Sequence, residues 1–380
     1  MMASSIPHLF RCPISLELFT DPVTLCTGQT YERSSIEKWM AAGNLTCPVT
    51  MQKLHDTSVV PNHTLRHLID QWFQGTGLDE PFLLSLKQNL SSDQATITSK
   101  IQALGTIRAL LEESPWIHSH INQLGFVPLL IELISGGSVT RPSAEWLRLV
   151  EEGLACIVDI LALRPSDGSL CKMFQEGFRL ASFKILFKQG SDRIMVLMCK
   201  AVEMLSVSSE TKYPCQIMRE IVVLICHNEE EISRAALRAV HALCCLENNL
   251  ENLVKAGAVE GVIGFILRDD QNDKVKDLTA AAASTLEKLV GIDEGKEALL
   301  NHPYGVVAIV RNVFRVSSDR QSIESALNSL MVMCSGSASS RASHQAIDAG
   351  VLSQLLLLLQ SHYSSRTKTK ARTLLKLLGT

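Results

Sequence analysis

Residues 8–50 read HLFRCPISLELFTDPVTLCTGQTYERSSIEKWMAAGNLTCPVT. Short apolar runs in this stretch are interrupted by proline, glycine and threonine, which is typical of a turn-rich module. The runs Pro22–Leu25 and Gln29–Glu32 flank Cys26–Gly28 and predict a β-hairpin with a tight turn. We therefore expect a compact segment with a small sheet in this part of the chain.

Two helices are expected after the hairpin. Ser34 or Ser35 can cap a helix from Ile36 to Ala42. Asn62, which follows a proline, can cap a second helix from His63 to Phe73. The hairpin and the helices form an α+β module of about 70 residues, a size that needs support beyond its apolar core.

The character of the sequence changes after the second helix. Residues 74–81 read QGTGLDEP, a combination of glycine, acid and proline that predicts a helix end and a linker. Beyond it, helical periodicity is nearly continuous. We therefore divide the chain into a module at residues 6–75, a linker at 76–81 and a helical region at 82–380.

The helical region contains an internal repeat. Apolar helices open, in most cases with a glycine, near residues 125, 177, 216, 257, 305 and 350. Successive openings are 39 to 52 residues apart, which agrees with the period of about 40 to 47 residues in armadillo and HEAT repeats. A longer apolar helix precedes most openings, so each unit is expected to contain a short helix and a long one.

The repeat completes the predicted fold class. No single unit can bury its apolar face alone, so neighbouring units must stack to form a continuous core. The chain is expected to be mainly α, with the small α+β module followed by an all-α, armadillo-type right-handed solenoid.

Composition and charge limit the kinds of partner. The 380-residue chain has a formal net charge of −3, so no overall basic field favours nucleic acid. It contains no run of about 18 apolar residues, so membrane insertion is not expected. The eleven cysteines are odd in number, lie mostly in apolar helical runs and follow no secretory signal, which indicates a reducing compartment. We expect a cytoplasmic protein, with the nucleus as a second location.

Motifs for catalysis and cofactor binding are absent from the sequence. There is no glycine-rich phosphate loop, no H-E-x-x-H and no G-x-S-x-G. In the first 75 residues, Cys12, Cys26 and Cys47 form no C-x-x-C pair, and the histidines lack ligand spacing. We predict no nucleophile, no metal site and no cofactor.

An ordered series of short motifs runs through residues 8–73. The series consists of FRCPISLE at 10–17, DPV at 21–23, GQTYER at 28–33, Ile36, Trp39, CPVT at 47–50 and PNHTL at 61–65. In order and spacing it resembles the U-box family, and the helical region resembles the armadillo repeats of plant U-box ligases. The resemblance implies a RING-like fold without zinc.

The same resemblance implies an E3 ubiquitin-protein ligase. Such a RING-type ubiquitin transferase binds a conjugating enzyme (E2) charged with ubiquitin and promotes transfer to a substrate lysine, without a covalent ubiquitin intermediate. It acts by positioning the reactants. The expected partners are an E2, ubiquitin and a protein substrate on the armadillo surface, and the expected setting is plant defence or stress signalling and proteasomal turnover. The alternative is a catalytically silent armadillo scaffold whose U-box only binds partners.

The resemblance also assigns roles to individual residues of the module. The E2-binding surface is expected to comprise Ile14, Val23, Trp39 and Pro48. The structural core is expected to include Cys12, Leu25, Tyr31, Ile36 and Leu65. Polar contacts must hold the loops in place of zinc, and the sequence leaves open the pairing among Glu17, Asp21, Glu32, Arg33, Glu37, Lys38 and Asn44.

One position departs from the family pattern. Many related ligases carry a cation after the threonine of the second Cys-Pro motif, where it contacts both E2 and ubiquitin. This chain has Met51 there, followed by Gln52 and Lys53. Because a methionine side chain cannot donate a hydrogen bond, either Gln52 or Lys53 takes over the E2–ubiquitin contact or the ligase stimulates ubiquitin discharge weakly.

A further group of polar residues lies in the helical region. Arg234, Arg238 and His241 are spaced so that they share one helix face. They form either a basic stripe in a substrate groove or an ordinary solvated face, and the sequence leaves both interpretations open.

Overall fold

The computed structural model describes residues 7–76, 80–113, 117, 121–122, 124–135, 143–162, 180–206, 213–268, 276–313, 320–335 and 339–379. The chain divides into two compact units, Met1–Ile134 and Ser135–Thr380. The linker predicted at 76–81 falls within the first unit, and its residues 77–79 lie outside the described residues, as does the helix opening predicted near residue 177.

The first unit begins with a three-stranded antiparallel sheet. After the short 3-10 helix η1 (His8–Phe10) come β1 (Pro22–Thr24), β2 (Thr30–Glu32) and, later in the chain, β3 (Val60–Pro61), in the spatial order β2-β1-β3. Val23 at the centre of β1 lies opposite Tyr31 on one side and Pro61 on the other. The predicted hairpin is confirmed. β3 was not predicted, because two residues are too few to give an alternating pattern.

Two helices complete the module, α1 (Arg33–Ala41) and α2 (His63–Thr76). The prediction that Ser34 or Ser35 caps the first helix is wrong, because α1 starts directly after β2 with Glu32 as its N-cap residue. The predicted cap of the second helix is confirmed: Asn62 Oδ1 accepts a hydrogen bond from the Leu65 backbone N–H at 3.0 Å.

Asn62 also ties the second helix to the hairpin. Its Nδ2 donates to the hydroxyl of Thr24 at 3.3 Å and of Thr30 at 3.2 Å. We expect Asn62→Ala to lower the stability of the module by about 2 kcal/mol, because the cap and the cross-links are lost together. Hydrogen exchange of the α2 amides in the full chain measures the effect. Asn62→Asp keeps the cap and should cost less; equal losses would contradict a role for the cap.

The first unit continues with helices α3 (Glu80–Ser91), α4 (Ile97–Glu113) and α6 (Phe126–Ser135). α3 packs against α4. Lys87 on α3 donates from Nζ to the carbonyl oxygen of Leu124, just before the left-handed Gly125. The helix opening predicted at residue 125 is confirmed by α6.

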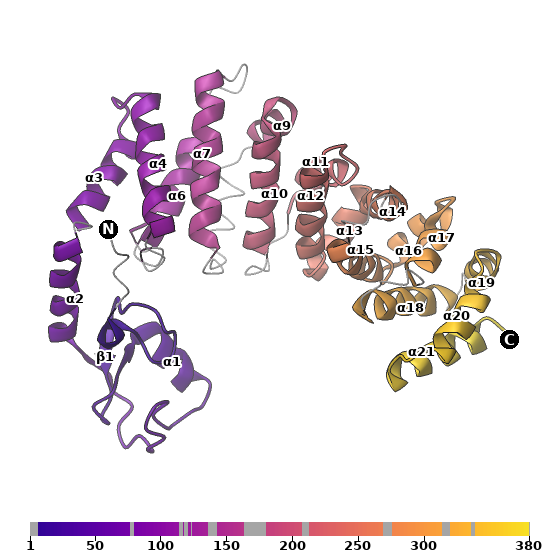
Figure 1. The fold of residues 1–380 in the computed structure, drawn as a ribbon, viewed down its shortest axis with the longest axis horizontal. Coiled ribbons are helices and arrows are strands. Elements are labelled where there is room, and N and C mark those ends of the chain that lie inside the picture. The colour runs from indigo at the N-terminus through magenta and orange to yellow at the C-terminus, as the bar shows by residue number, and fades with distance from the viewer. Residues whose placement is uncertain are drawn as a thin grey trace. The chain divides into compact units, whose positions relative to one another are not determined.

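The second unit is built of helices. They are α7 (Ala144–Leu161), α9 (Leu180–Gln189), α10 (Asp192–Ser206), α11 (Cys215–Leu224), α12 (Glu230–Leu243), α13 (Glu247–Lys255), α14 (Ala258–Arg268), α15 (Lys276–Leu289), α16 (Asp293–Asn301), α17 (Gly305–Val313), α18 (Arg320–Cys334), α19 (Ser339–Asp348), α20 (Val351–Gln360) and α21 (Ser365–Leu377). In Figure 1 the long helices α7, α10, α12, α15 and α18 follow one another as neighbours, each packed on the next.

The last repeats contain three helices each. The short helices α13, α16 and α19 begin at residues 247, 293 and 339, which are 46 residues apart. The prediction of two helices per unit is therefore wrong for these repeats. The short helices escaped detection because they bury few apolar residues, and α13 buries only Asn249 and Leu253 among its nine residues.

Glycines open several of these helices for two different reasons. Gly257 and Gly350 adopt left-handed backbone angles, φ +87° and +85°, which residues with a Cβ rarely tolerate. At Gly305, a Cβ atom would lie 2.2 Å from the carbonyl oxygen of Leu299, so close backbone approach excludes a side chain. Among the residues described in the two units, no helix is long and apolar enough to cross a membrane.

Candidate functional site

Two loops of the small module share one backbone design. The first loop spans residues 11–18 and is closed by a bridge between Arg11 and Leu18; the second spans residues 46–53 and is closed between Thr46 and Lys53. In the first loop, Cys12 N–H donates to the carbonyl of residue 17 and its own carbonyl accepts from residue 16, both at 2.8 Å. The second loop repeats this pattern around Cys47 at 2.8 and 2.9 Å.

The residue four positions after the cysteine of each loop has a left-handed backbone conformation. Leu16 and Met51 both have φ of +59°, a conformation that costs a residue with a Cβ roughly 1 kcal/mol. Leu16 is 67% exposed and Met51 is 70% exposed. The local strain therefore coincides with two apolar side chains that point into solvent, one at the tip of each loop.

Hydrogen bonds to sulfur anchor both loops to neighbouring residues of β2. Cys12 Sγ accepts from the backbone N–H of Ile14 at 3.4 Å and of Glu32 at 3.3 Å. Cys47 Sγ lies 2.9 Å from the hydroxyl of Tyr31, and the same hydroxyl accepts from Val49 N–H at 3.2 Å. Because Tyr31 and Glu32 are adjacent in β2, a single strand holds the two loops in register with each other.

The electrostatics around Cys47 reflect this anchoring. Burial raises the pKa of the Cys47 thiol, but hydrogen bonds from Thr27, Thr50 and Tyr31 outweigh burial and lower it to about 6. Burial and the bond to Cys47 raise the pKa of Tyr31. The phenol therefore stays protonated and serves as a donor to the sulfur.

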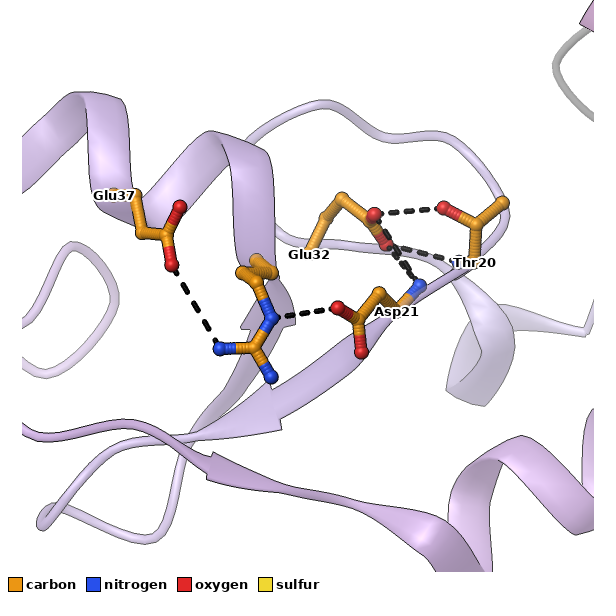
Figure 2. Close-up of polar contacts among 5 residues, drawn as sticks. Thr20, Asp21, Glu32 and Glu37 are labelled. Carbon is orange, nitrogen blue, oxygen red and sulfur yellow. Dashed lines mark hydrogen bonds and ion pairs between the residues drawn. The ribbon is translucent and has the colours of Figure 1, made fainter. Parts of the chain in front are cut away.

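A buried carboxylate fixes the end of the first loop. Glu32 is 7% exposed, and its carboxylate accepts from Thr20 N–H at 2.9 Å, from Thr20 Oγ1 at 2.7 Å and from Asp21 N–H at 3.1 Å (Figure 2). Thr20 did not emerge from the sequence as part of this network. The carboxylate ties the segment between the first loop and β1 to the end of β2.

Arg33, the residue after Glu32, adds ion pairs to this network. Its guanidinium pairs with two carboxylates, with Nε at 2.6 Å from Asp21 and a terminal nitrogen at 3.7 Å from Glu37. The hydrogen bond to Asp21 raises the pKa of Arg33. Asn44 Nδ2 separately donates to the Trp39 carbonyl at 3.1 Å. These contacts give partners to several side chains whose pairing the sequence left open.

Three of the four residues assigned to the E2-binding surface are accessible. Ile14 and Pro48 are half-buried on the first and second loops. Trp39 is half-buried on α1, and its Nε1 donates to the carbonyl of Thr46, which joins the helix to the second loop. Ile14 and Trp39 pack against the same core. That core contains Cys47, the residue before Pro48.

The assignment of Val23 to this surface is wrong. Val23 is 0% exposed, because β1 is the middle strand and its central side chain enters the core. The residues expected in the core lie there: Cys12, Leu25, Tyr31 and Ile36 are buried, and Leu65 packs against them half-buried.

Exposed apolar residues that the sequence reasoning missed flank the accessible three. Leu16, Val49 and Met51 are exposed on the loop tips. The internal likeness of CPISL and CPVTM is the sequence signal that could have paired Leu16 with Met51, which occupy the same position of the two motifs and have similar exposure. Gln52 and Lys53, the candidates for the E2–ubiquitin contact, are also exposed.

The basic residues of α12 differ from one another in their contacts and exposure. Arg234 pairs with Glu230 one turn away, and His241 Nδ1 lies 3.1 Å from Thr285 Oγ1 of α15. Burial and nearby Lys288 lower the pKa of His241. Arg238 is exposed, and its charge opposes the effect of burial, which raises the pKa of Glu203 on α10. The stripe therefore includes contacts between successive long helices.

The described part of the chain contains no group of three or more His, Cys, Asp or Glu side chains arranged to hold a metal ion.

Two family models match the chain. The model described as U-box domain matches residues 6–77. The model described as plant U-box protein ARM repeat region matches residues 84–380, more than three quarters of the sequence.

Relatives share both regions. U-box domain-containing protein 26 of Arabidopsis thaliana is 32% identical over 400 residues, covering 98% of this chain and 91% of that protein. E3 ubiquitin-protein ligase PUB23 of the same species is 27% identical over 394 residues, covering 98% of this chain and 92% of that protein.

Solved structures show the same helical architecture. A designed armadillo repeat protein in complex with the peptide (KR)4 matches with a TM-score of 0.50 at 15% identity, covering 66% of this chain and 99% of its own. An engineered protein matches with a TM-score of 0.57 at 18% identity, covering 78% of this chain and 68% of its own. These likenesses show the armadillo fold of the helical repeats.

Proposed function

Because this chain belongs to the plant U-box proteins with armadillo repeats, we propose that it is an E3 ubiquitin-protein ligase that transfers ubiquitin from a bound E2 to a substrate lysine. The observation that carries the proposal is the match along nearly the whole chain to relatives named as E3 ubiquitin-protein ligases. The E2 and ubiquitin follow from the U-box as partners.

The chemistry asks little of the ligase except geometry. The substrate lysine attacks the thioester that links ubiquitin to the E2, and the E2 cysteine leaves. The U-box supplies a rigid docking surface, formed by Ile14, Trp39 and Pro48 and enlarged by Leu16 and Val49. Tyr31 and Glu32, one residue apart in β2, hold both loops without a metal, so that docking does not require the loops to become ordered first.

An autoubiquitination assay tests the proposal. The purified full chain, incubated with E1, ATP, ubiquitin and each of several E2 enzymes, should build ubiquitin chains that depend on the ligase and on one or more of the E2s. The second candidate, a silent scaffold, is favoured by Met51 at the position where related ligases carry a cation. Binding of E2 without any ladder, for every E2 tested, would support the scaffold.

Replacing Met51 by Arg should raise the rate of ubiquitin discharge from charged E2 to free lysine. A new charge-assisted hydrogen bond contributes about 1 kcal/mol, which corresponds to about fivefold in rate. The left-handed backbone at residue 51 is no more strained for Arg than for Met. A single-turnover assay with the full chain measures the discharge, and the affinity for uncharged E2 should change little.

Two comparisons interpret the outcome for Met51. Met51→Leu, which adds no donor, should leave the rate at the wild-type value. If Gln52 or Lys53 already supplies the contact, Gln52→Ala or Lys53→Ala lowers the wild-type rate and Met51→Arg adds little to it. An unchanged rate for Met51→Arg together with unchanged rates for both alanine variants would contradict any role for this loop edge in discharge.

The armadillo region is proposed to hold the substrate. Exposed Arg238, near Glu203 on the neighbouring long helix, is the member of the α12 stripe best placed to reach a bound segment. Arg234 and His241 support the surface through their contacts with Glu230 and Thr285.

The cellular location and pathway are also proposals. We propose that the protein acts in the cytoplasm, with the nucleus as a second location, and in plant defence or stress signalling with proteasomal turnover of its substrates. Fluorescence microscopy of the tagged full chain tests the location.

A further inference from the structure

One face of the last described repeat carries a stripe of leucines. α20 reads VLSQLLLLLQ, and Leu352, Leu356 and Leu359 recur at the spacing that places them on one side of a helix. Leu356 is 54% exposed, and Leu352 and Leu359 are partly exposed. The buried residues Val351, Leu355 and Leu358 form a different side, which faces the interior of the repeat.

The equivalent stripe is buried in an internal repeat. α14, like α20, follows a left-handed glycine, and aligning Gly257 with Gly350 matches Val259, Ile263 and Ile266 to the three leucines. Those three residues are 0%, 0% and 6% exposed.

The neighbours of α14 explain this burial. A Cβ on Gly261 or Gly264 would meet Val222 or Cys226, in or next to α11 of the preceding repeat. Val259, Ile263 and Ile266 lie on the opposite side of α14, and the helices of the following repeat, α16 and α17, pack against α14. The leucine stripe of α20 therefore corresponds to a surface that packs against other helices in an internal repeat.

The helix that packs against α20 is rich in cations. α21, which packs against α20, reads SRTKTKARTLLKL and has no acidic residue. Thr367, Ala371 and Leu374 are buried on the side that meets α18, where Thr367 Oγ1 also contacts Glu324 at 3.2 Å.

Two of these cations are on the side of α21 that faces away from α18. Lys370 pairs with Glu324 at 3.7 Å. Arg372 and Lys376, four residues apart and exposed, lie on the opposite side of the helix from Thr367 and Leu374. We call Leu352, Leu356, Leu359, Arg372 and Lys376 the end face.

We propose that the end face binds an acidic amphipathic helix of a partner protein. Its apolar strip has the spacing at which this chain itself receives helices in an internal repeat, so a helix with apolar residues at intervals of three and four fits it. Arg372 and Lys376 select glutamate or aspartate on the flank of that helix. The end face shares no residue with the E2-docking loops, so its binding can be tested independently of ubiquitin transfer.

A designed peptide tests the proposal without knowledge of the natural partner. The probe is a fluorescent helical peptide of about 18 residues with leucines on one side and glutamates on both flanks, and anisotropy is measured with the full chain. We expect saturable binding that weakens about tenfold for Leu356→Asp and for the double variant Arg372→Glu/Lys376→Glu. Val223→Asp, at an exposed valine of α11, should bind as wild type.

A charge swap separates recognition from misfolding. A peptide with lysines in place of glutamates should bind the double Glu variant better than it binds wild type. A scrambled peptide of the same composition that binds as well as the probe would overturn the proposal.

Two other occupants are distinguishable. Vesicles containing phosphatidylserine that bind wild type but not Leu356→Asp, with no peptide binding, would show a membrane contact instead. Concentration-dependent dimers in analytical ultracentrifugation that Leu356→Asp abolishes, again with no peptide binding, would show self-association instead.

Discussion

The Ile14→Ala variant of the full chain is expected to lose most of its autoubiquitination activity. Ile14 lies half-buried on the first loop. Its backbone N–H donates a hydrogen bond to Cys12 Sγ at 3.4 Å, which holds the loop backbone in place. Truncating an apolar anchor at the centre of an interface typically costs 2 kcal/mol or more, or roughly 30-fold in affinity. The initial rate of ladder formation at a subsaturating E2 concentration should fall by about this factor, while saturating E2 should restore part of it.

The loss must be separated from an effect on folding, because part of Ile14 packs against the core. Val49→Ala provides this separation: Val49 stands in the second loop where Ile14 stands in the first, and it is 51% exposed. It should lower the rate severalfold without changing thermal unfolding. Leu68→Ala, at an exposed leucine of α2 outside the two loops, should keep the wild-type rate. If Ile14→Ala forms ubiquitin ladders at the wild-type rate with every active E2, the two loops do not form the E2-docking surface.

Local sequence signals predicted the secondary structure of the U-box best where each element carries its own signal. The hairpin followed from two short extended runs that flank a turn, and Asn62 was found as a cap because it acts on the helix that follows it. The cap of α1 could not be found in this way. Glu32 occupies that position, and its side chain accepts hydrogen bonds from Thr20, twelve residues earlier, and from Asp21, eleven residues earlier.

The repeats show a similar limit. The long helices gave clear apolar periodicity, and stacking of one on the next accounts for it. The short helices such as α13, with the sequence ENNLENLVK, present mostly polar residues to solvent. Their helical state depends on the adjacent helices more than on their own pattern, so a search for apolar periodicity missed them.

The residues of the candidate site were predictable where the order of the sequence motifs identifies them. The resemblance to the U-box family pointed to Ile14, Trp39 and Pro48, which the structure leaves accessible. It also pointed to Val23, which is buried because its side chain lies on the face of the sheet that packs into the core. The resemblance gives the order of the motifs but not the face of the sheet on which a residue lies, so the exposure of Val23 could not be judged from the sequence.

The Glu32→Ala variant is expected to unfold the U-box within the otherwise folded chain. Removal of the carboxylate leaves the N–H groups of Thr20 and Asp21 and the hydroxyl of Thr20 without their buried acceptor. Hydrogen bonds to a charged group contribute about 1.5 to 3 kcal/mol each, so the expected loss is about 3 to 5 kcal/mol when their non-additivity is included. A module of this size has a total stability of roughly 3 to 5 kcal/mol, so the loss is comparable to all of it.

Hydrogen exchange of the full chain, resolved by peptides, measures the loss where it occurs. Amides of β1, β2 and α1 should lose protection in Glu32→Ala, whereas those of the helices in the second unit should keep it, since the repeats form their own core. Glu37→Ala is the matched control: it removes an exposed carboxylate 3.7 Å from Arg33, and such a surface pair contributes about 1 kcal/mol or less. Glu32→Gln keeps one acceptor and should fall between the two. Full protection of β1 and β2 in Glu32→Ala would mean that the sulfur-centred bonds of Cys12 and Cys47 hold the loops without the carboxylate, and the geometry of the loops would then depend on the two cysteines instead.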